Sequence, residues 1–207
     1  MSRILFALLT SAVLLSPASY ADEKPAKAEE AGRAPDTFRV KVTTSKGEFI
    51  IEVTREWAPL GADRFHELVK KEFYKEARFF RVLPGFVAQF GMHADPEVHS
   101  QWVNKRIKDD PKVAGVSNKK GYLTFAHAGP GTRTTQLFIN YGDNSRLDDL
   151  GFPPFGRVIK GMEVVEAINS EYRQDPDQGR IRSKGNVYLK AEFPNLDYIK
   201  EMKIIKK

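Results

Sequence analysis

The chain contains no cysteine among its 207 residues. This absence excludes disulfide bonds, a thiol nucleophile, metal sites with cysteine ligands, and a lipid-modified cysteine at a signal-cleavage site. It is compatible with an oxidising compartment. Stability must therefore come from a hydrophobic core, and a chain of this length can bury one.

Long apolar runs are scarce as well. The run at 4–15 is shorter than the roughly 20 residues that a membrane-spanning helix needs. It follows Arg3 and precedes Pro17 and the small residue Ala21, which is the pattern of a secretory signal peptide. We predict a signal peptide at 1–21, cleavage after Ala21, a periplasmic or secreted location, and no membrane contact after cleavage.

A strong excess of charge of either sign is also missing. Removing Arg3 from the 33 Lys and Arg leaves 32 against 27 Asp and Glu, a net charge of +5 (32 minus 27). The basic residues are spread along the chain and lack the interleaved aromatic residues of a single-strand nucleic-acid groove. We interpret the charge as a solubility feature and expect no nucleic-acid partner.

Composition divides the remaining chain into two parts. Residues 22–36 contain no aromatic and no β-branched residue, which predicts a flexible linker. Residues 37–207 have an even, globular composition without internal repeats, so we predict a single domain there.

Periodicity within the domain predicts many strands and few helices. The expected strands begin with a hairpin and end with a closing strand: 38–44, 48–53, 122–128, 135–140 and 201–205. Helices are expected at 59–73 and 161–168, a loop at 171–184, and a short helix at 187–193. The polar stretch 92–118 is expected to form a long excursion packed down by Trp102. Many strands and two main helices predict a closed antiparallel barrel.

The stretch 79–91 stands out because it is apolar almost throughout and yet holds Arg81 and Gln89. It predicts a pair of buried strands or one strongly bent strand. A cation in such surroundings either has a function, extends to the surface, or pairs with a carboxylate. Strict alternation would not direct Arg81, Phe86 and Gln89 to one side, so we expect Pro84-Gly85 to break the register.

Three separated blocks carry a resemblance to a known family. They are Phe-x-Arg-Val-x-Pro-Gly-Phe-x-x-Gln at 79–89, Ala-Gly-Pro to Gln-x-Phe-Ile at 128–139, and Phe-Gly-Arg-Val at 155–158. In this order and spacing the chain, from about Phe38 onward, resembles the cyclophilin-type peptidyl-prolyl cis-trans isomerases. The resemblance implies a mainly β fold, a closed eight-stranded antiparallel barrel capped by two α-helices.

The resemblance also implies roles for ten residues in Xaa-Pro bond rotation. Arg81 would be the catalytic donor, and Gln89 would orient it. The substrate-binding residues would line a proline slot, supply an amide, or form the edge along which the peptide runs: Phe86, Ala126, His127, Ala128, Gln136, Phe138, Leu147 and Phe152. The apolar residues among them could instead belong to an ordinary core, and the glutamines could be structural amides.

Bond rotation of this kind needs neither a cofactor nor a metal, and none is expected. His66-Glu67 begins like a zinc-protease helix motif, but Lys70 stands where the second histidine should be. The motif therefore does not predict a metal site.

Two departures from the family pattern affect the expected ligands. Arg146 occupies the place of a Trp found in many eukaryotic members, and Phe152 or Pro153 lies near the place of a His. His127 stands where the family usually has Asn. Both changes at 146–153 resemble bacterial members, and they predict weak cyclosporin binding with the proline slot intact.

The leading hypothesis is an exported, monomeric prolyl isomerase that acts on proline-containing unfolded or flexible polypeptides. Two alternatives remain from other classes. One is a non-catalytic chaperone or assembly module that holds proline-containing peptides in the same groove. The other is a structural barrel without a peptide site.

Overall fold

The computed structural model describes residues 32–206. The predicted signal peptide, linker residues 22–31 and Lys207 lie outside this range. The last residues of the predicted linker contact the domain, because Ala34 is buried and its backbone N–H donates to Asp63 Oδ1 at 2.8 Å.

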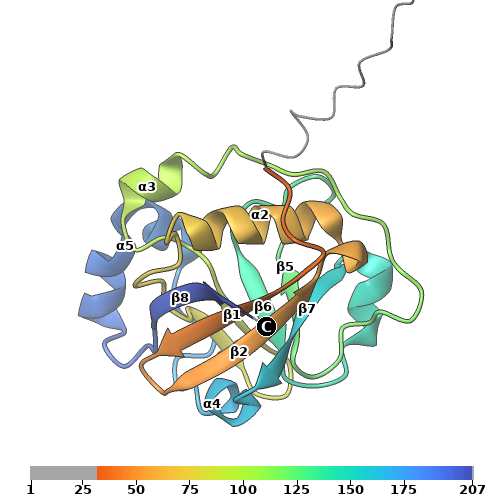
Figure 1. The fold of residues 1–207 in the computed structure, drawn as a ribbon. Coiled ribbons are helices and arrows are strands. Elements are labelled where there is room, and N and C mark those ends of the chain that lie inside the picture. Colours follow the sequence, from red (N-terminus) through yellow and green to blue (C-terminus); the bar gives the residue numbers. More distant parts are fainter. Residues whose placement is uncertain (1–31, 207) are drawn as a thin grey trace, which may run out of the picture. The chain divides into compact units, whose positions relative to one another are not determined.

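Eight strands form one antiparallel sheet (Figure 1). In chain order they are β1 (Thr37–Thr44), β2 (Glu48–Thr54), β3 (Arg81–Leu83), β4 (Val87–Phe90), β5 (Tyr122–Phe125), β6 (Leu137–Asn140), β7 (Pro154–Lys160) and β8 (Ile199–Ile205). Their order across the sheet is β3-β4-β6-β5-β7-β2-β1-β8. The predicted hairpin, the strand pair at 79–91 and the closing strand are all confirmed.

The sheet curls into a half-barrel, and the strand pairing does not support the predicted closed barrel. Within residues 32–206 no ladder joins the outermost strands, β3 and β8; the segments just before them are linked by an isolated bridge between Arg78 and Tyr198 and by backbone hydrogen bonds between residues 76–79 and 197–199. The reason lies at the free edge of β3, which is three residues long. There the backbone N–H of Val82 donates to the carbonyl of Arg173 at 2.8 Å. A loop segment therefore occupies the edge that a closing strand would need.

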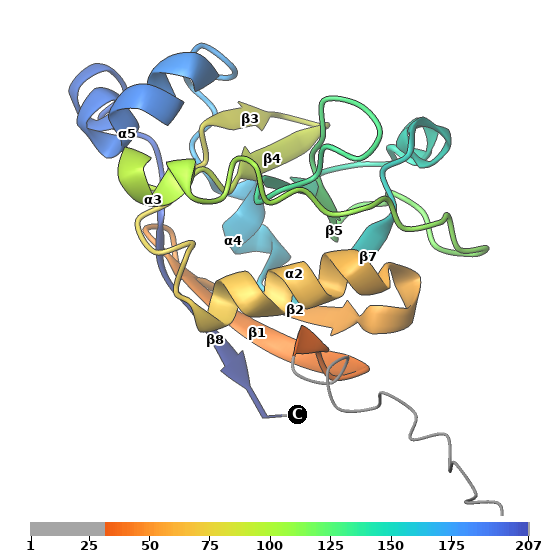
Figure 2. The same cartoon turned by 90° about the horizontal axis from the view of Figure 1, so that it is seen from above.

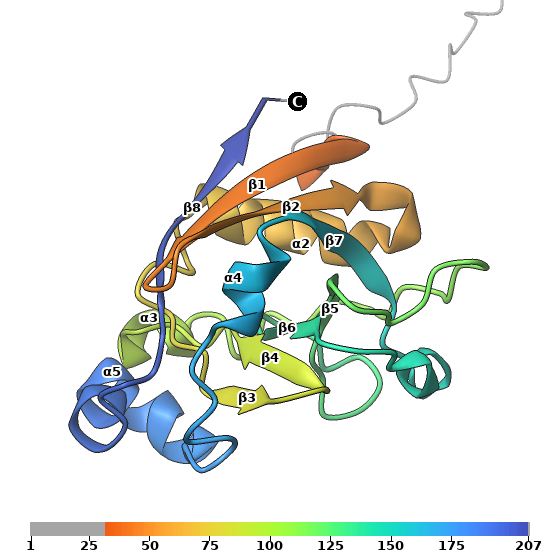
Figure 3. The same ribbon diagram turned by 90° about the horizontal axis from the view of Figure 1, so that it is seen from below.

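The inner face of the sheet holds the core. Along β1 every second residue is buried, as alternation requires when one face packs inward. Helix α2 (Pro59–Lys70) closes one side of the curled sheet, and helix α4 (Met162–Glu166) lies on the opposite side (Figures 1 and 3). Phe65 of α2 packs against Phe155 of β7, with ring centroids 5.3 Å apart.

The helix predictions were right for α2 and α4 and incomplete elsewhere. Two further helices are present in the described part of the chain, α3 (Pro96–Ser100) and α5 (Gln178–Glu192), and they lie side by side (Figure 2). The predicted loop at 171–184 is therefore wrong in its second half. Two residues explain the extent and shape of α5. Asp177 caps its start by accepting the N–H of Arg180, and Gly185 kinks it with φ of 53°.

Gly185 also explains how α5 docks. A Cβ atom at this position would lie 2.1 Å from the carbonyl oxygen of Ala94, so the close approach requires glycine. Ile181 and Tyr188, on either side of the kink, then join Phe80 and Met92 in a second apolar cluster. The kink disturbs the helical spacing of apolar residues, which is why periodicity did not indicate one long helix.

The excursion 92–118 is anchored as expected by Trp102. Its side chain is buried, and its ring lies 5.6 Å from that of Phe73. A second anchor was not foreseen: Asp110 reaches back to the start of α2 and accepts the backbone N–H groups of Leu60 and Gly61, each at 2.9 Å.

Candidate active site

Strands β4 and β6 are buried on both faces, and this property creates the site. Alternation directs Ala88 and Phe90 into the main core, while Val87 joins a separate apolar cluster on the other face. On β6, Ile139 faces the main core and Phe138 joins that same cluster. The site therefore lies on the face of the sheet that points away from the barrel core.

Three neighbouring strands place the candidate residues in one row. Arg81 of β3 pairs directly with Gln89 of β4, and Gln89 pairs with Phe138 of β6. Residues paired across adjacent strands point to the same face. This pairing brings the predicted donor, its predicted orienting amide and the predicted slot residue together.

A tight turn brings Phe86 to the same place. Gly85 adopts φ of 75°, a left-handed conformation that favours glycine, and the N–H of Phe86 donates to the carbonyl of Leu83 at 2.9 Å. Instead of the expected register break, residues 84–86 form a turn between two strands, and the β3–β4 ladder keeps an unbroken register. Phe86 lies beside the guanidinium of Arg81, with 5.6 Å between Cζ and the ring centroid.

A pocket of about 200 Å³ opens at this row. Eight of the ten predicted site residues line it, together with Val87: Arg81, Phe86, Gln89, Ala126, His127, Phe138, Leu147 and Phe152. Its floor is apolar, because Val87, Phe138 and Leu147 form a buried cluster. Such a slot accommodates a small apolar ring, and Arg81, Gln89 and His127 are the polar residues that line it.

Arg81 is half-buried at the edge of this pocket. Its Nη1 donates to Gln89 Oε1 at 3.2 Å, and its Nε lies 3.5 Å from Gln174 Oε1. Within residues 32–206 it forms no salt bridge, and its Nη2 donates no hydrogen bond. Burial lowers the pKa of Arg81, but an Arg remains charged at any pH near neutrality. The guanidinium thus keeps donors free for a ligand, which argues against the interpretation as a paired structural cation.

A chain of amides continues from Arg81. Gln89 Nε2 donates to Gln136 Oε1 at 2.9 Å, and Gln136 Nε2 lies 3.4 Å from Gln178 Oε1. Because each amide oxygen accepts from its neighbour, Gln89 presents its oxygen to Arg81 and cannot rotate freely. No sequence pattern indicated Gln174 and Gln178 as site residues, since both lie in the segment predicted to be loop.

His127 is held by its neighbours on both ring nitrogens. Nδ1 accepts the N–H of Gly129 at 3.1 Å, so Nε2 carries the proton that it donates to the carbonyl of Gly151 at 3.0 Å. The ring stacks on Phe152 with centroids 3.9 Å apart. This arrangement makes His127 a wall of the pocket, while its backbone and that of Ala126 follow the edge predicted to meet the substrate.

A polar network behind the pocket fixes the segment that carries Leu147 and Phe152. Asp148 accepts from the hydroxyl of Ser117 and from the backbone N–H of Asn118, and Asn118 Nδ2 donates to the carbonyl of Phe152 at 2.7 Å. Burial raises the pKa of Asp148, and the hydrogen bonds from Ser117 and Asn118 more than offset this, so the pKa is lowered overall. The short helix η3 (Ser145–Leu150) is held in place by these bonds.

The two remaining predicted residues, Ala128 and Gln136, line a second pocket. Its volume is about 390 Å³, and it shares Gln89, Ala126 and His127 with the first pocket. The two pockets therefore adjoin, and together they are called the groove. Residues from the excursion and from α5, which sequence patterns did not associate with the site, complete it.

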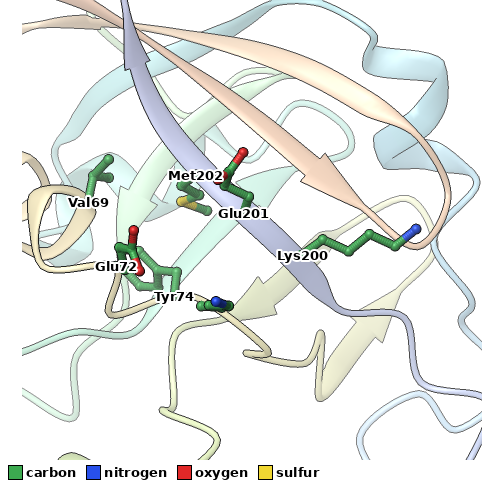
Figure 4. A pocket seen from close by; sticks show the side chains of 7 residues that line it. Val69, Glu72, Tyr74, Lys200, Glu201 and Met202 are labelled. Carbon is green, nitrogen blue, oxygen red and sulfur yellow. The ribbon is translucent and has the colours of Figure 1, made fainter.

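Another pocket lies between the end of α2 and β8, and it offers no comparable chemistry (Figure 4). Its volume of about 30 Å³ is on the order of one or two water molecules. Lys200 extends away from the other labelled side chains, so its ammonium group does not join Glu72 and Tyr74 (Figure 4).

Two further observations concern the described residues as a whole. Within 32–206, no three His, Asp or Glu side chains are grouped closely enough to hold a metal ion. None of the helices in that range combines the length and apolar character needed to cross a membrane.

Comparison with known proteins places these features in a family. Residues 39–188 match the model described as cyclophilin type peptidyl-prolyl cis-trans isomerase/CLD. A peptidyl-prolyl cis-trans isomerase of Acinetobacter baylyi is 36% identical over 134 residues, covering 62% of this chain and 70% of the relative. Peptidyl-prolyl cis-trans isomerase A of Dickeya dadantii is 33% identical over 141 residues, covering 66% and 73%.

Solved structures show the same fold. A cyclophilin type peptidyl-prolyl cis-trans isomerase of Cryptosporidium parvum superimposes with a TM-score of 0.63 at 22% identity, covering 83% of this chain and 99% of the other. The same Cryptosporidium parvum protein, in the presence of the dipeptide Ala-Pro, superimposes with a TM-score of 0.62.

Proposed function

The chain belongs to the cyclophilin-type peptidyl-prolyl cis-trans isomerases, and from this premise we propose that the groove around Arg81 is where it rotates Xaa-Pro bonds of flexible polypeptides. The observation that carries this proposal is the unpaired guanidinium of Arg81 at the edge of an apolar pocket. Deleting that guanidinium in Arg81→Ala is the test, and the expected result is a large loss of turnover with little loss of peptide affinity.

The chemistry requires little more than binding and one well-placed donor. Amide resonance sets a barrier of roughly 18–20 kcal/mol to rotation, and no covalent bond to carbon has to break. As the bond twists, the prolyl nitrogen loses conjugation and gains a lone pair that can accept a hydrogen bond. A donor that meets this lone pair binds the twisted amide more strongly than either planar isomer.

Each part of the groove supports one part of this process. The apolar cluster of Val87, Phe138 and Leu147 would hold the proline ring and keep water away from it. Arg81 would donate to the prolyl nitrogen with the nitrogens that its protein neighbours leave free. The amide chain from Gln89 would hold the guanidinium in place, so that it need not reorganise as the bond twists.

A flat pH profile is the first expected result. Arg81 keeps its charge across the range in which the protein is folded, and rotation uses no acid or base, so turnover should vary less than about twofold from roughly pH 6 to 9. Isomerisation of an Ala-Pro peptide measured across this range tests the prediction. A steep fall toward acidic pH would instead implicate His127, the other ionisable side chain that lines the first pocket.

Weak cyclosporin binding is the second expected result. Arg146 lies over Phe86, with 4.9 Å from Cζ to the ring centroid, and offers neither the apolar face nor the single ring donor of an indole. Replacing it by tryptophan should strengthen inhibition about tenfold or more, the equivalent of roughly 1.4 kcal/mol. Titration calorimetry with the parent and Arg146→Trp measures this. Equal affinities would contradict the assignment of position 146.

We further propose that the mature protein is exported to the periplasm or secreted, that it resembles bacterial members, and that it acts as a monomer on proteins folding there. The sequence pattern of residues 1–21 supports export, and the relatives from Acinetobacter and Dickeya support the bacterial character.

Export predicts a native N-terminus at Asp22. N-terminal sequencing of protein from a soluble extracytoplasmic fraction measures it, and light scattering on the same sample gives the mass. A native chain that still begins before Ile4 would contradict export.

A further inference from the structure

The second pocket of the groove has an unusual charge balance. Eleven residues line it, and none is Asp or Glu: Gln89, Val103, Arg106, Ala126, His127, Ala128, Thr132, Thr134, Gln136, Gln178 and Arg182. Two of them are arginines, and the others that are polar carry amides, hydroxyls or an imidazole. The pocket therefore presents positive charge without a compensating carboxylate in its wall.

Neither arginine is neutralised elsewhere. Arg106 and Arg182 are both exposed and form no ion pair with any residue in the range 32–206. Arg180, two residues before Arg182 on α5, is by contrast paired, because it forms a bidentate contact with Glu192. Arg182 also affects a buried group. Burial is the main reason why the pKa of His99 is lowered, and the positive charge of Arg182 is the next.

The two arginines come from different parts of the chain: Arg182 from α5 and Arg106 from the excursion 92–118. Arg182 lies one helical turn after Gln178 on α5, so the two share a face of the helix. The buried Ile181 anchors this part of α5. Arg106 precedes Ile107, whose N–H donates to the carbonyl of Arg133 at 3.0 Å and ties the excursion to the segment before β6.

A bound peptide would extend from one pocket into the other. The pockets share Gln89, Ala126 and His127, so a chain with its proline in the first pocket places a neighbouring residue in the second. An extended peptide advances roughly 3.3–3.6 Å per residue. The peptide residue whose side chain enters the second pocket therefore lies within a few residues of the proline. A carboxylate there would meet two guanidinium groups that form no ion pair within residues 32–206.

We propose that the second pocket selects client segments with an Asp or Glu side chain close to the proline, and that Arg106 and Arg182 determine this selectivity. The inference rests on the proposed function of the groove and adds the class of substrate. Both arginines are exposed, so their attraction for a carboxylate is screened by salt. We expect a preference of about three- to tenfold in kcat/KM for Glu over Gln at low salt, and its loss at high salt.

A peptide scan tests the proposal. The probes are alanine-based peptides with one Xaa-Pro bond, in which Glu, Gln or Lys occupies each of the three positions before and the two positions after the proline. Isomerisation is measured by exchange NMR at about 20 mM and about 500 mM salt, which change the Debye length from about 20 Å to a few Å. At one position the expected order is Glu, then Gln, then Lys, and the order should vanish at high salt.

Variants assign the effect to the two arginines. In Arg106→Gln/Arg182→Gln the ratio of Glu to Gln peptide should fall to about one. Arg180→Gln is the matched control, because Arg180 lies on the same helix but is paired with Glu192, and it should keep the parent ratio. Equal rates for Glu and Gln peptides at every position, or a preference that survives in the double variant, would overturn the inference and leave the isomerase function intact. Failure of the parent to isomerise the neutral peptide would overturn the proposed function and this inference together.

Discussion

Replacing Arg81 by alanine is expected to lower kcat about thirty- to nearly a thousand-fold while the affinity for peptide changes little. The range corresponds to roughly 2–4 kcal/mol of transition-state stabilisation, the usual loss when one preorganised donor is removed. The loss should fall on kcat because the guanidinium interacts more strongly with the twisted amide than with the planar one. Exchange NMR on an Ala-Pro peptide gives the rate, and calorimetric titration gives the affinity.

Two further variants separate the role of Arg81 from general damage to the groove. Arg81→Lys should recover little activity, because a point charge on a flexible stem does not reproduce the planar fork held by Gln89. Phe138→Ala should weaken binding and slow turnover together, since it empties the proline slot. A thermal melt of each variant is the control for folding. A folded Arg81→Ala protein with close to parental activity would show that Arg81 is not the donor.

Replacing Asp110 by alanine is expected to destabilise the protein by about 3–5 kcal/mol, a large part of the stability of a typical domain. Asp110 and Arg133 form an ion pair at 3.0 Å, and the side chain of each is only 1% exposed. The same carboxylate accepts the N–H groups of Leu60 and Gly61 at the start of α2. Its removal would leave a buried cation without its partner and two helix N–H groups without an acceptor.

The neighbouring residue supplies a matched control. Asp109 also approaches Arg133, at 3.6 Å, but its side chain is 37% exposed, so Asp109→Ala should cost less than about 1 kcal/mol. Urea unfolding followed by the fluorescence of Trp57 and Trp102 measures both variants. Equal midpoints for Asp110→Ala and the parent would refute the view that this pair ties the excursion to the fold.

Sequence patterns predicted the secondary structure correctly where a segment buries one face and exposes the other. The alternation at 37–54 predicted the hairpin β1–β2, because these strands bury one face and expose the other. The spacing of Phe65 and Leu68 predicted α2 for the same reason. The family motif placed Arg81, Gln89 and Phe138 at one site, and strand pairing brings them into one row. Their catalytic roles stay predictions until the variants are measured.

The remaining features depended on interactions that no local pattern records. The edge of β3 is covered by a distant segment, because the N–H of Val82 donates to the carbonyl of Arg173. The kink at Gly185 disturbed the period of α5, so the helix that carries Gln178 and Arg182 was predicted to be partly loop. Ion pairing between Asp110 and Arg133 joins residues 23 apart in sequence and is visible only once the chain is folded.

Exchange NMR on one Ala-Pro peptide, with catalytic amounts of the mature protein, tests the central claim most directly. The claim predicts that the parent sharply accelerates exchange between cis and trans peptide over the uncatalysed timescale of tens of seconds. It also predicts that Arg81→Ala at the same concentration binds the peptide but accelerates exchange about thirty- to nearly a thousand-fold less. A parent protein that binds the peptide without accelerating exchange would contradict it and indicate a peptide-binding module in place of an enzyme.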